Sequence, residues 1–321
     1  MSEVKLVTVG AAEDGIRLDR WLRRRWPALN QVQIHKLARG GQLRVDGARV
    51  KADSRLVAGA LVRVPPLPEG PLPRPPEAIS DRDATFARGL VLYEDDEVLI
   101  LNKPAGLAVQ GGTKTLHHLD RLLGAWGEGP RRPRLAHRLD RDTSGVLALG
   151  KSPDAAARLS GAFARRRACK TYWALVEGNP KPDAGVVDLP LAKLGAEDRE
   201  RMVPVGPGDP NGKAAVTDYA TIARAGLRAA WLALEPQTGR THQLRAHLLA
   251  LGHPILGDPK YNTLSSVAAS GPLKLQLHAR RLVIPHPGGG VIDVSAPLSP
   301  EMREGFRRFG FELTEAAPVG P

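Results

Sequence analysis

The sequence predicts an α+β protein built from two units, and three observations support this prediction. The chain has 321 residues, which is more than one ordinary domain needs. Residues 65–76 read PPLPEGPLPRPP, and seven prolines in twelve residues exclude a helix or a central strand there. Short apolar runs bounded by turn residues occur together with amphipathic, helix-like runs. We therefore expect a small unit over 1–64, a linker over 65–80, a large unit over 81–312 and a frayed tail over 313–321.

The charge of the chain favours a polyanionic partner. Lys and Arg number 46 against 34 Asp and Glu, which gives a formal net charge of +12 and an isoelectric point near 10.2. Such an excess is typical of nucleic-acid-binding proteins, although a generally basic proteome would produce the same sign. The net charge alone therefore favours nucleic acid without deciding for it.

The cysteine count and the apolar runs argue against secretion, a membrane location and a cysteine-based metal site. Cys169 is the only cysteine, so the chain can form no internal disulfide and no cysteine-based metal site. The first residues lack the basic start and apolar run of a signal peptide, and no apolar run reaches the roughly 18 residues of a membrane span. We expect a cytoplasmic monomer that has no membrane partner.

The first 64 residues predict two helices followed by short strands. An apolar face on the basic run 17–26 predicts one helix. Asn30 is a suitable N-cap for a second helix that ends at Ala38, before two glycines. The expected strands are 43–45, 49–51 and 61–64, with a turn at 46–47.

More than half of the net charge lies in this fifth of the chain. Residues 1–64 contain 13 Lys or Arg and 6 Asp or Glu. A solvated basic face would have the same composition, but the concentration of charge in so small a unit favours contacts with RNA phosphates. The expected contact residues are Arg17, Arg20, Arg24, Lys36, Arg39 and Arg44.

This unit resembles the RNA-binding module first seen in small-subunit ribosomal protein S-four. The matching stretches are RLDRWL at 17–22, IHKLARGGQLRVDGARVK at 34–51 and GALVRVPP at 59–66. Asp46 stands where the module commonly has Asn, and residues 30–33 replace its usual Ser-Arg-Ser opening of the second helix. The resemblance implies a helix pair and a hairpin that bind RNA.

The stretch HRLDRDTSGVLALGK at 137–151 carries the strongest chemical signal. Asp140 lies between Arg138 and Arg141, at a turn that precedes the apolar strand 146–149. A carboxylate held beside arginines is favoured in its charged form and is available as a nucleophile or a base. On these residues alone, a turn aspartate paired with a neighbouring arginine is the simpler alternative.

The same stretch resembles the RluA-type pseudouridine synthases. Their motif H-R-L-D-x-x-T-S-G is matched at every fixed position by residues 137–145. Further blocks of the family follow in order: K-x-Y-x-A-x-V-x-G at 170–178, TGRTHQLRAH at 238–247, GHPILGDPKYN at 252–262 and LHARRLVIPHP at 277–287. Within the family, the stretches VRVPP at 62–66 and LNKPAGLAVQGGT at 101–113 are most similar to the large-subunit ribosomal synthases of type C.

This resemblance implies a fold, a reaction and a set of site residues. The large unit should hold a mixed, mainly antiparallel sheet flanked by helices, with a cleft across its middle. The reaction should be the isomerisation of uridine to pseudouridine in RNA, with large-subunit ribosomal RNA as the expected substrate and no cofactor. Asp140 matches the family's catalytic aspartate, Arg245 the arginine that pairs with it, and Tyr172 the tyrosine that stacks on the target base. Arg138 matches the arginine that fills the gap left by the target uridine.

Two alternatives stay open: the same reaction on transfer RNA, and RNA binding without catalysis. The intact set of site residues argues against the second. A metal site is not expected, because His137, His242 and His247 lack the i, i+4 spacing of zinc proteases and no cysteine joins them. The sequence does not choose among attack at ribose C1′, attack at uracil C6 and proton abstraction as the role of Asp140.

Overall fold

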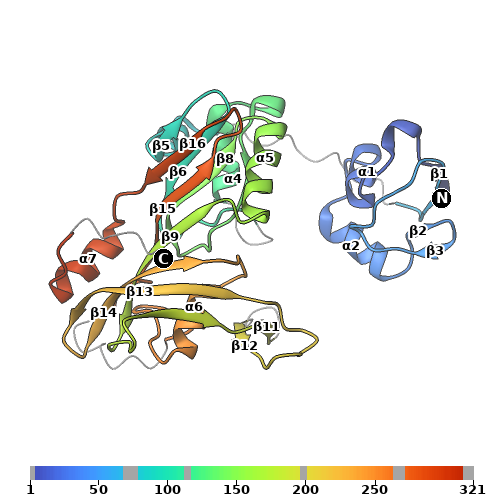
Figure 1. The fold of residues 1–321 in the computed structure, drawn as a ribbon. Coiled ribbons are helices and arrows are strands. Elements are labelled where there is room, and N and C mark those ends of the chain that lie inside the picture. Colours follow the sequence, from blue (N-terminus) through green and yellow to red (C-terminus); the bar gives the residue numbers. More distant parts are fainter. Residues whose placement is uncertain (1–3, 68–78, 112–116, 196–200, 263–271, 314–321) are drawn as a thin grey trace. The chain divides into compact units, whose positions relative to one another are not determined.

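The chain divides into two compact units, Met1–Ala78 (unit 1) and Ile79–Pro321 (unit 2). The computed structural model describes residues 4–67, 79–111, 117–195, 201–262 and 272–313 (Figure 1). Most of the predicted linker, 68–78, and the predicted tail from 314 onward lie outside the described residues. Among the described helices, none combines the length and the apolar character that a membrane crossing requires.

Unit 1 combines two α-helices with a four-stranded sheet of order β1-β4-β2-β3. All three strand pairings in this sheet are antiparallel. The elements are β1 (Lys5–Thr8), the 3-10 helix η1 (Ala11–Glu13), α1 (Leu18–Arg25), α2 (Gln31–Arg39), β2 (Arg44–Val45), β3 (Ala48–Arg49) and β4 (Leu61–Val64).

Local chemistry explains why unit 1 folds this way. The Asn30 side chain accepts a hydrogen bond from the backbone N–H of Gln33 at 2.8 Å, and the Gln33 side chain accepts one from the backbone N–H of Asn30 at 2.9 Å. This capping box starts α2 at the predicted residue. Asp46 and Gly47 both have positive φ, as a tight two-residue turn between β2 and β3 requires. The two strands of this hairpin are shorter than expected.

Unit 2 is organised around a ten-stranded sheet. Eight strands follow the order β10-β13-β14-β9-β15-β8-β6-β5, while β16 pairs with β15 and β7 pairs with β8. A separate two-stranded sheet contains β11 and β12. The strands are β5 (Val91–Glu94), β6 (Val98–Lys103), β7 (Arg134–Leu135), β8 (Ser144–Gly150), β9 (Cys169–Glu177), β10 (Ala184–Asp188), β11 (Leu191–Leu194), β12 (Arg201–Pro204), β13 (Val216–Ala225), β14 (Ala229–Pro236), β15 (Leu277–Pro285) and β16 (Val291–Ser295).

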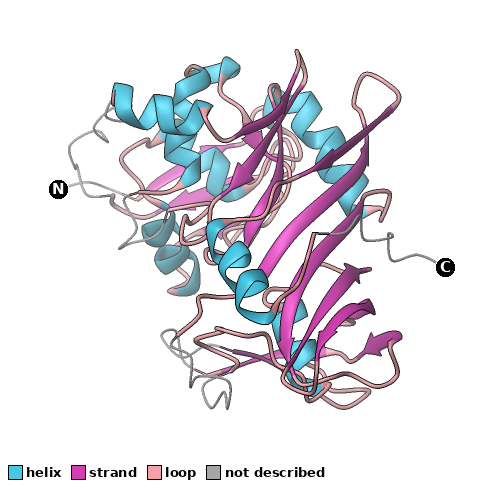
Figure 2. Ribbon diagram, turned by 90° about the vertical axis from the view of Figure 1, so that its left-hand side faces the viewer, coloured by secondary structure: helices cyan, strands magenta, loops and turns pink. Residues whose placement is uncertain are grey.

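Helices cover both faces of this sheet (Figure 2). Successive side chains of a strand point to opposite faces. On β9, Tyr172 belongs to the core cluster that includes Leu244 of α6, whereas Trp173 belongs to the cluster that includes Phe306 of α7. The helices are α3 (Asp81–Arg88), α4 (Leu119–Leu122), α5 (Pro153–Ala164), α6 (Gln243–Ala250) and α7 (Pro300–Phe309), with the 3-10 helices η2 (Leu123–Trp126) and η3 (Gly129–Arg131).

The strands β8 and β15 form the one parallel pairing among the described strands. It spans two residue pairs, Ser144 with His278 and Gly145 with Ala279, and Ser144 Oγ lies 2.9 Å from His278 Nδ1. Gly145 has a φ of 110°, and a Cβ at this position would lie 2.1 Å from the carbonyl oxygen of Ala279. Only glycine therefore permits this approach of the two strands. The predicted α+β fold with a mixed, mainly antiparallel sheet is confirmed.

Candidate active site

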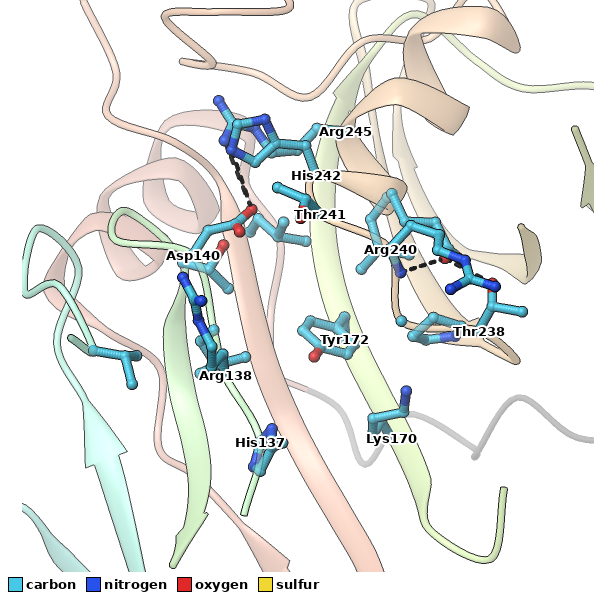
Figure 3. A pocket seen from close by; sticks show the side chains of 18 of the residues that line it. His137, Arg138, Asp140, Lys170, Tyr172, Thr238, Arg240, Thr241, His242 and Arg245 are labelled. Carbon is cyan, nitrogen blue, oxygen red and sulfur yellow. Dashed lines mark hydrogen bonds and ion pairs between the residues drawn. The ribbon is translucent and has the colours of Figure 1, made fainter. Parts of the chain in front are cut away.

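A cavity of about 1210 Å³ in unit 2 contains the four residues that the sequence singled out for chemistry. Its walls include the loop 137–143 before β8, the start of β9 and the segment 235–245 that leads into α6. Seven of the lining residues are Lys or Arg and three are Asp or Glu, so the cavity attracts a polyanion. The four site residues are Arg138, Asp140, Tyr172 and Arg245 (Figure 3).

Asp140 presents an open carboxylate to this cavity. Its side chain is 28% exposed, and its Oδ2 lies 3.7 Å from Arg245 Nη1 and 3.8 Å from His242 Nε2. Figure 3 shows the carboxylate directed toward both groups. These distances give charge attraction but are too long for hydrogen bonds. Both oxygens are therefore available to a substrate.

The arginines next to Asp140 in the sequence are not its ion-pair partners. Arg141 pairs instead with Asp142, with 3.1 Å between Nε and Oδ1. Arg138 is exposed at the cavity wall. The cation opposite Asp140 is Arg245 of α6, the arginine that the family resemblance indicated as its partner.

A second carboxylate, which the sequence analysis did not single out, fixes Arg245 in place. Nε and Nη2 of Arg245 donate to the two oxygens of Asp258, each at 2.7 Å. The Asp258 side chain is fully buried. Burial opposes its ionisation, yet the hydrogen bonds and charge of Arg245 hold the pKa of Asp258 below its usual value. A bidentate pair fixes the guanidinium plane, so Nη1 is left to face Asp140.

His242 is the other group opposite Asp140, and it has an unusual backbone. Its φ of 51° and ψ of 21° are left-handed, a conformation that costs energy in a residue with a side chain. The hydroxyl oxygen of Tyr261 accepts from the backbone N–H of Met202 at 2.8 Å and lies 3.1 Å from His242 Nδ1. We infer that the hydroxyl donates to Nδ1, which leaves the ring proton on Nε2, facing Asp140. Burial lowers the pKa of His242 and favours this neutral ring.

Lys103 anchors the loop that carries Asp140. Its side chain is fully buried. Burial lowers the pKa of Lys103 to about 7, despite the charges of nearby carboxylates. Its Nζ donates at 2.9 Å to each of three carbonyl oxygens, those of Pro104, Leu107 and Arg141.

Tyr172 lies on β9 and lines the cavity across from the Asp140 loop. Its ring is 9% exposed. Burial raises the pKa of Tyr172, and the negative charge of Asp140 acts in the same direction. The phenol therefore keeps its proton at neutral pH and offers a flat, uncharged ring beside the carboxylate.

The other two motif histidines have structural partners. His137 Nε2 accepts from the backbone N–H of Ala148 at 3.0 Å, and burial lowers the pKa of His137 to about 3. His247 is fully buried, with its ring nitrogens 3.0 Å from the hydroxyl of Thr217 and 3.1 Å from the carbonyl oxygen of Leu189. Both rings tie strands and loops of unit 2 together.

In unit 1, the six basic residues expected to contact RNA fall into two groups. Arg17 donates two hydrogen bonds to Asp19, at 2.7 and 3.1 Å, and Arg44 donates to the carbonyl oxygens of Gly41 and Gly47. These two arginines already have structural partners. The exposed members of the set are Arg20, Arg24, Lys36 and Arg39.

Comparison with known proteins identifies the class of this protein. The sequence model of the family described as RNA pseudouridylate synthase matches residues 97–250. Over 313 residues the chain is 36% identical to the ribosomal large subunit pseudouridine synthase C of Escherichia coli (strain K12), covering 95% of each protein. The chain belongs to the RNA pseudouridylate synthase family and is a pseudouridine synthase. Within this family it is also similar to the ribosomal large subunit pseudouridine synthase C of Vibrio vulnificus (strain CMCP6), at 33% identity over 94% of this chain and 96% of that protein.

Solved structures agree with this assignment. Human RNA Pseudouridylate Synthase Domain Containing 4 superposes with a TM-score of 0.59 at 31% identity, over 72% of this chain and 98% of that one. Human RNA Pseudouridylate Synthase Domain Containing 1 gives a TM-score of 0.55 at 27% identity, over 72% of this chain and 96% of that one.

Proposed function

We propose that the protein converts uridine to pseudouridine in large-subunit ribosomal RNA, with Asp140 as the catalytic carboxylate. The observation that carries the proposal is the open carboxylate of Asp140 in a basic cavity, opposite a guanidinium that Asp258 fixes. The relatives from E. coli and V. vulnificus are named for the large ribosomal subunit, which supports the choice of RNA.

The reaction needs a nucleophile or a base. The bond between ribose C1′ and uracil N1 breaks, the base rotates, and C1′ bonds to C5. C5 gives up its proton and N1 gains one, so the product is an isomer of the substrate. An ionised carboxylate can attack C1′ or C6, or remove a proton from the sugar. In each of these roles a carboxylate oxygen must reach the substrate, and Asp140 accepts no hydrogen bond from any described residue.

Arg245 acts on Asp140 through its charge. At 3.7 Å, Nη1 attracts the carboxylate without covering either oxygen. Because Asp258 holds the other two nitrogens, the guanidinium need not reorganise during the reaction. Arg245 thus orients the carboxylate toward the cavity.

The target nucleotide must leave its stack before its C1′ and C5 can react, at a cost of a few kcal/mol. Tyr172 offers a flat ring on which the extruded base stacks. Arg138, exposed at the cavity wall, supplies a planar guanidinium that occupies the vacated place in the RNA. The positions of both side chains on the cavity wall support these roles.

Unit 1 supplies a separate RNA anchor of the S-four type. Its exposed basic side chains, Arg20, Arg24, Lys36 and Arg39, are suited to phosphate contacts. An anchor of this kind fits a large structured substrate such as ribosomal RNA better than a short one. The proposed place of action is the cytoplasm, where ribosomal RNA is assembled into subunits.

Release of tritium from 5-tritiated uridine tests the proposal, because C5 must lose its hydrogen. The protein is incubated in chelator with transcripts of large-subunit ribosomal RNA and, separately, of transfer RNA. We expect release from the ribosomal transcript alone. Release from transfer RNA only would identify transfer RNA as the substrate, and no release from either RNA would contradict the function.

A truncated chain that begins at Ile79 tests the role of unit 1. This chain should release tritium at high RNA concentration, but it should bind RNA more weakly and with a shallower dependence of affinity on salt.

A further inference from the structure

Lys170 lies on the cavity wall, and its positive charge takes part neither in the described contacts of the fold nor in the proposed reaction. It lies on β9 two residues before Tyr172, so both side chains point to the same face of the strand. Figure 3 shows the two side chains on the same strand, beside the cavity. Lys170 is partly buried, and its ammonium forms no hydrogen bond or ion pair with any residue that the structure describes.

The other basic side chains of the cavity are better compensated. Arg245 and Arg141 form ion pairs with carboxylates. Burial and the charges of Arg245 and Arg201 lower the pKa of Lys260, while two carboxylates, Asp140 and Asp258, act in the opposite direction. The remaining three are exposed and keep their hydration: Arg138, Arg166 and Arg240. Lys170 is thus a partly buried cavity cation on which no carboxylate acts, and the adjacent Cys169 is the one group that opposes the effect of burial.

A partly buried ammonium without a counter-charge is unfavourable in the free protein. Burial lowers the pKa of Lys170, which reflects the loss of hydration around its charged form. The adjacent His137 offers no compensation, since the positive charge of Lys170 adds to the burial that lowers the pKa of His137. A group of this kind is stabilised when a ligand brings the missing negative charge into the cavity.

We propose that Lys170 binds a backbone phosphate of the RNA, one next to the uridine held at Tyr172. This inference rests on the proposed function, in which the target base stacks on Tyr172. Side chains two residues apart on a strand are about 7 Å apart, a separation within the span of one nucleotide. Phosphate is the anion that RNA carries at every nucleotide, and a lysine ammonium binds it as a point charge without strict geometry.

The experiment compares three variants with the wild-type enzyme. Lys170→Met keeps a long unbranched side chain and removes the charge, and Lys170→Arg keeps the charge. Lys274→Met is the matched control: its side chain is 80% exposed, pairs with Glu301 at 3.4 Å and does not line the cavity. Binding to a large-subunit ribosomal RNA transcript is measured by filter retention across a salt series. Thermal melting checks that each variant is folded, and tritium release is followed in parallel.

We expect Lys170→Met to bind about tenfold more weakly at low salt and to lower the slope of log affinity against log salt by about one unit. Lys170→Arg and Lys274→Met should keep the wild-type slope. A folded Lys170→Met protein with wild-type affinity and slope would overturn the inference, as would a variant whose tritium release alone falls. Absence of tritium release by the wild-type enzyme would count against the proposed function instead, and the salt slopes would still decide the phosphate contact.

Discussion

The tetrapeptide Arg-Leu-Asp-Arg occurs in both units, at 17–20 and at 138–141, and its two aspartates have opposite surroundings. The side chain of Asp19 is 6% exposed and accepts hydrogen bonds from Arg17, Gln31 and the backbone N–H of Arg20. The side chain of Asp140 is 28% exposed and accepts no hydrogen bond from any described residue. The same four residues therefore build a satisfied carboxylate in one unit and an open one in the other.

The difference lies in what the rest of each unit supplies. The first copy of the tetrapeptide begins α1, and the helix start brings Arg17 back onto Asp19. The second copy lies in a loop, and its paired cation is Arg245 of α6. The tetrapeptide alone therefore does not distinguish the two aspartates. Asp140 differs in facing a cation from another element, Arg245, which Asp258 holds in place.

The largest expected effect belongs to Asp140→Asn. The amide keeps the shape of the side chain but cannot act as an anionic nucleophile or base, so tritium release should fall by at least about 10³-fold. RNA affinity in a filter-binding assay should change by less than about threefold, because the phosphate contacts persist. A pure Asn variant that keeps more than about a hundredth of the wild-type rate would remove Asp140 from its role.

Asp258→Asn should have the next largest effect, because it leaves Arg245 buried without its fixed partner. Removal of one partner of a buried ion pair lowers the free energy of unfolding by about 3–5 kcal/mol. The misplaced guanidinium should also slow tritium release by roughly 10²-fold. Urea unfolding and single-turnover kinetics measure the two effects. Wild-type values in both would show that Arg245 is held by other contacts.

Asp19→Asn should affect stability and leave chemistry intact. Burial opposes ionisation of Asp19, but hydrogen bonds from Arg17 and Gln31 lower its pKa to about 2, below the ordinary 3.8. Its contribution, about 2 kcal/mol, is therefore present above pH 4 and is lost as the pH falls through about 2. Hydrogen exchange of the α1 amides should show this pH dependence in the wild type and not in the variant. Equal exchange in both proteins would show that the charge of Asp19 does not stabilise unit 1.

Tyr261→Phe should have the smallest effect, a fall in tritium release of about threefold. The variant removes the hydroxyl that we infer donates to His242 Nδ1, so the neutral ring loses its preference for a proton on Nε2. Nitrogen-15 chemical shifts of the His242 ring report this directly. A wild-type ring with its proton on Nδ1 would contradict the inferred arrangement, whatever the rate of the variant.

The sequence predicted correctly those parts of the fold that depend on interactions between residues close together in the chain. The Asn30 cap, the turn at 46–47 and the strand at 61–64 all depend on residues that are neighbours in the chain. The arrangement around Asp140 depends on contacts across the fold. Ser144 and His278, which join β8 to β15, are separated by 134 positions, and no periodicity in the sequence reports such a pairing.

The same limit explains which site residues were missed. Asp258 and His242 lie inside recognisable blocks of sequence, but their significance depends on where α6 places Arg245 and on a left-handed backbone at its first turn. Lys103 was not singled out either, because the three carbonyl groups that bind its ammonium converge on it only in the folded chain.

The parallel pairing of β8 with β15 lies between the two parts of the sheet that carry the site. Asp140 precedes β8, whereas Tyr172 lies on β9 and Arg245 on α6. A side chain at position 145 would collide with the carbonyl group of Ala279 and push β8 away from β15. Such a displacement would also move the Asp140 carboxylate relative to Arg245 Nη1, which lies 3.7 Å away.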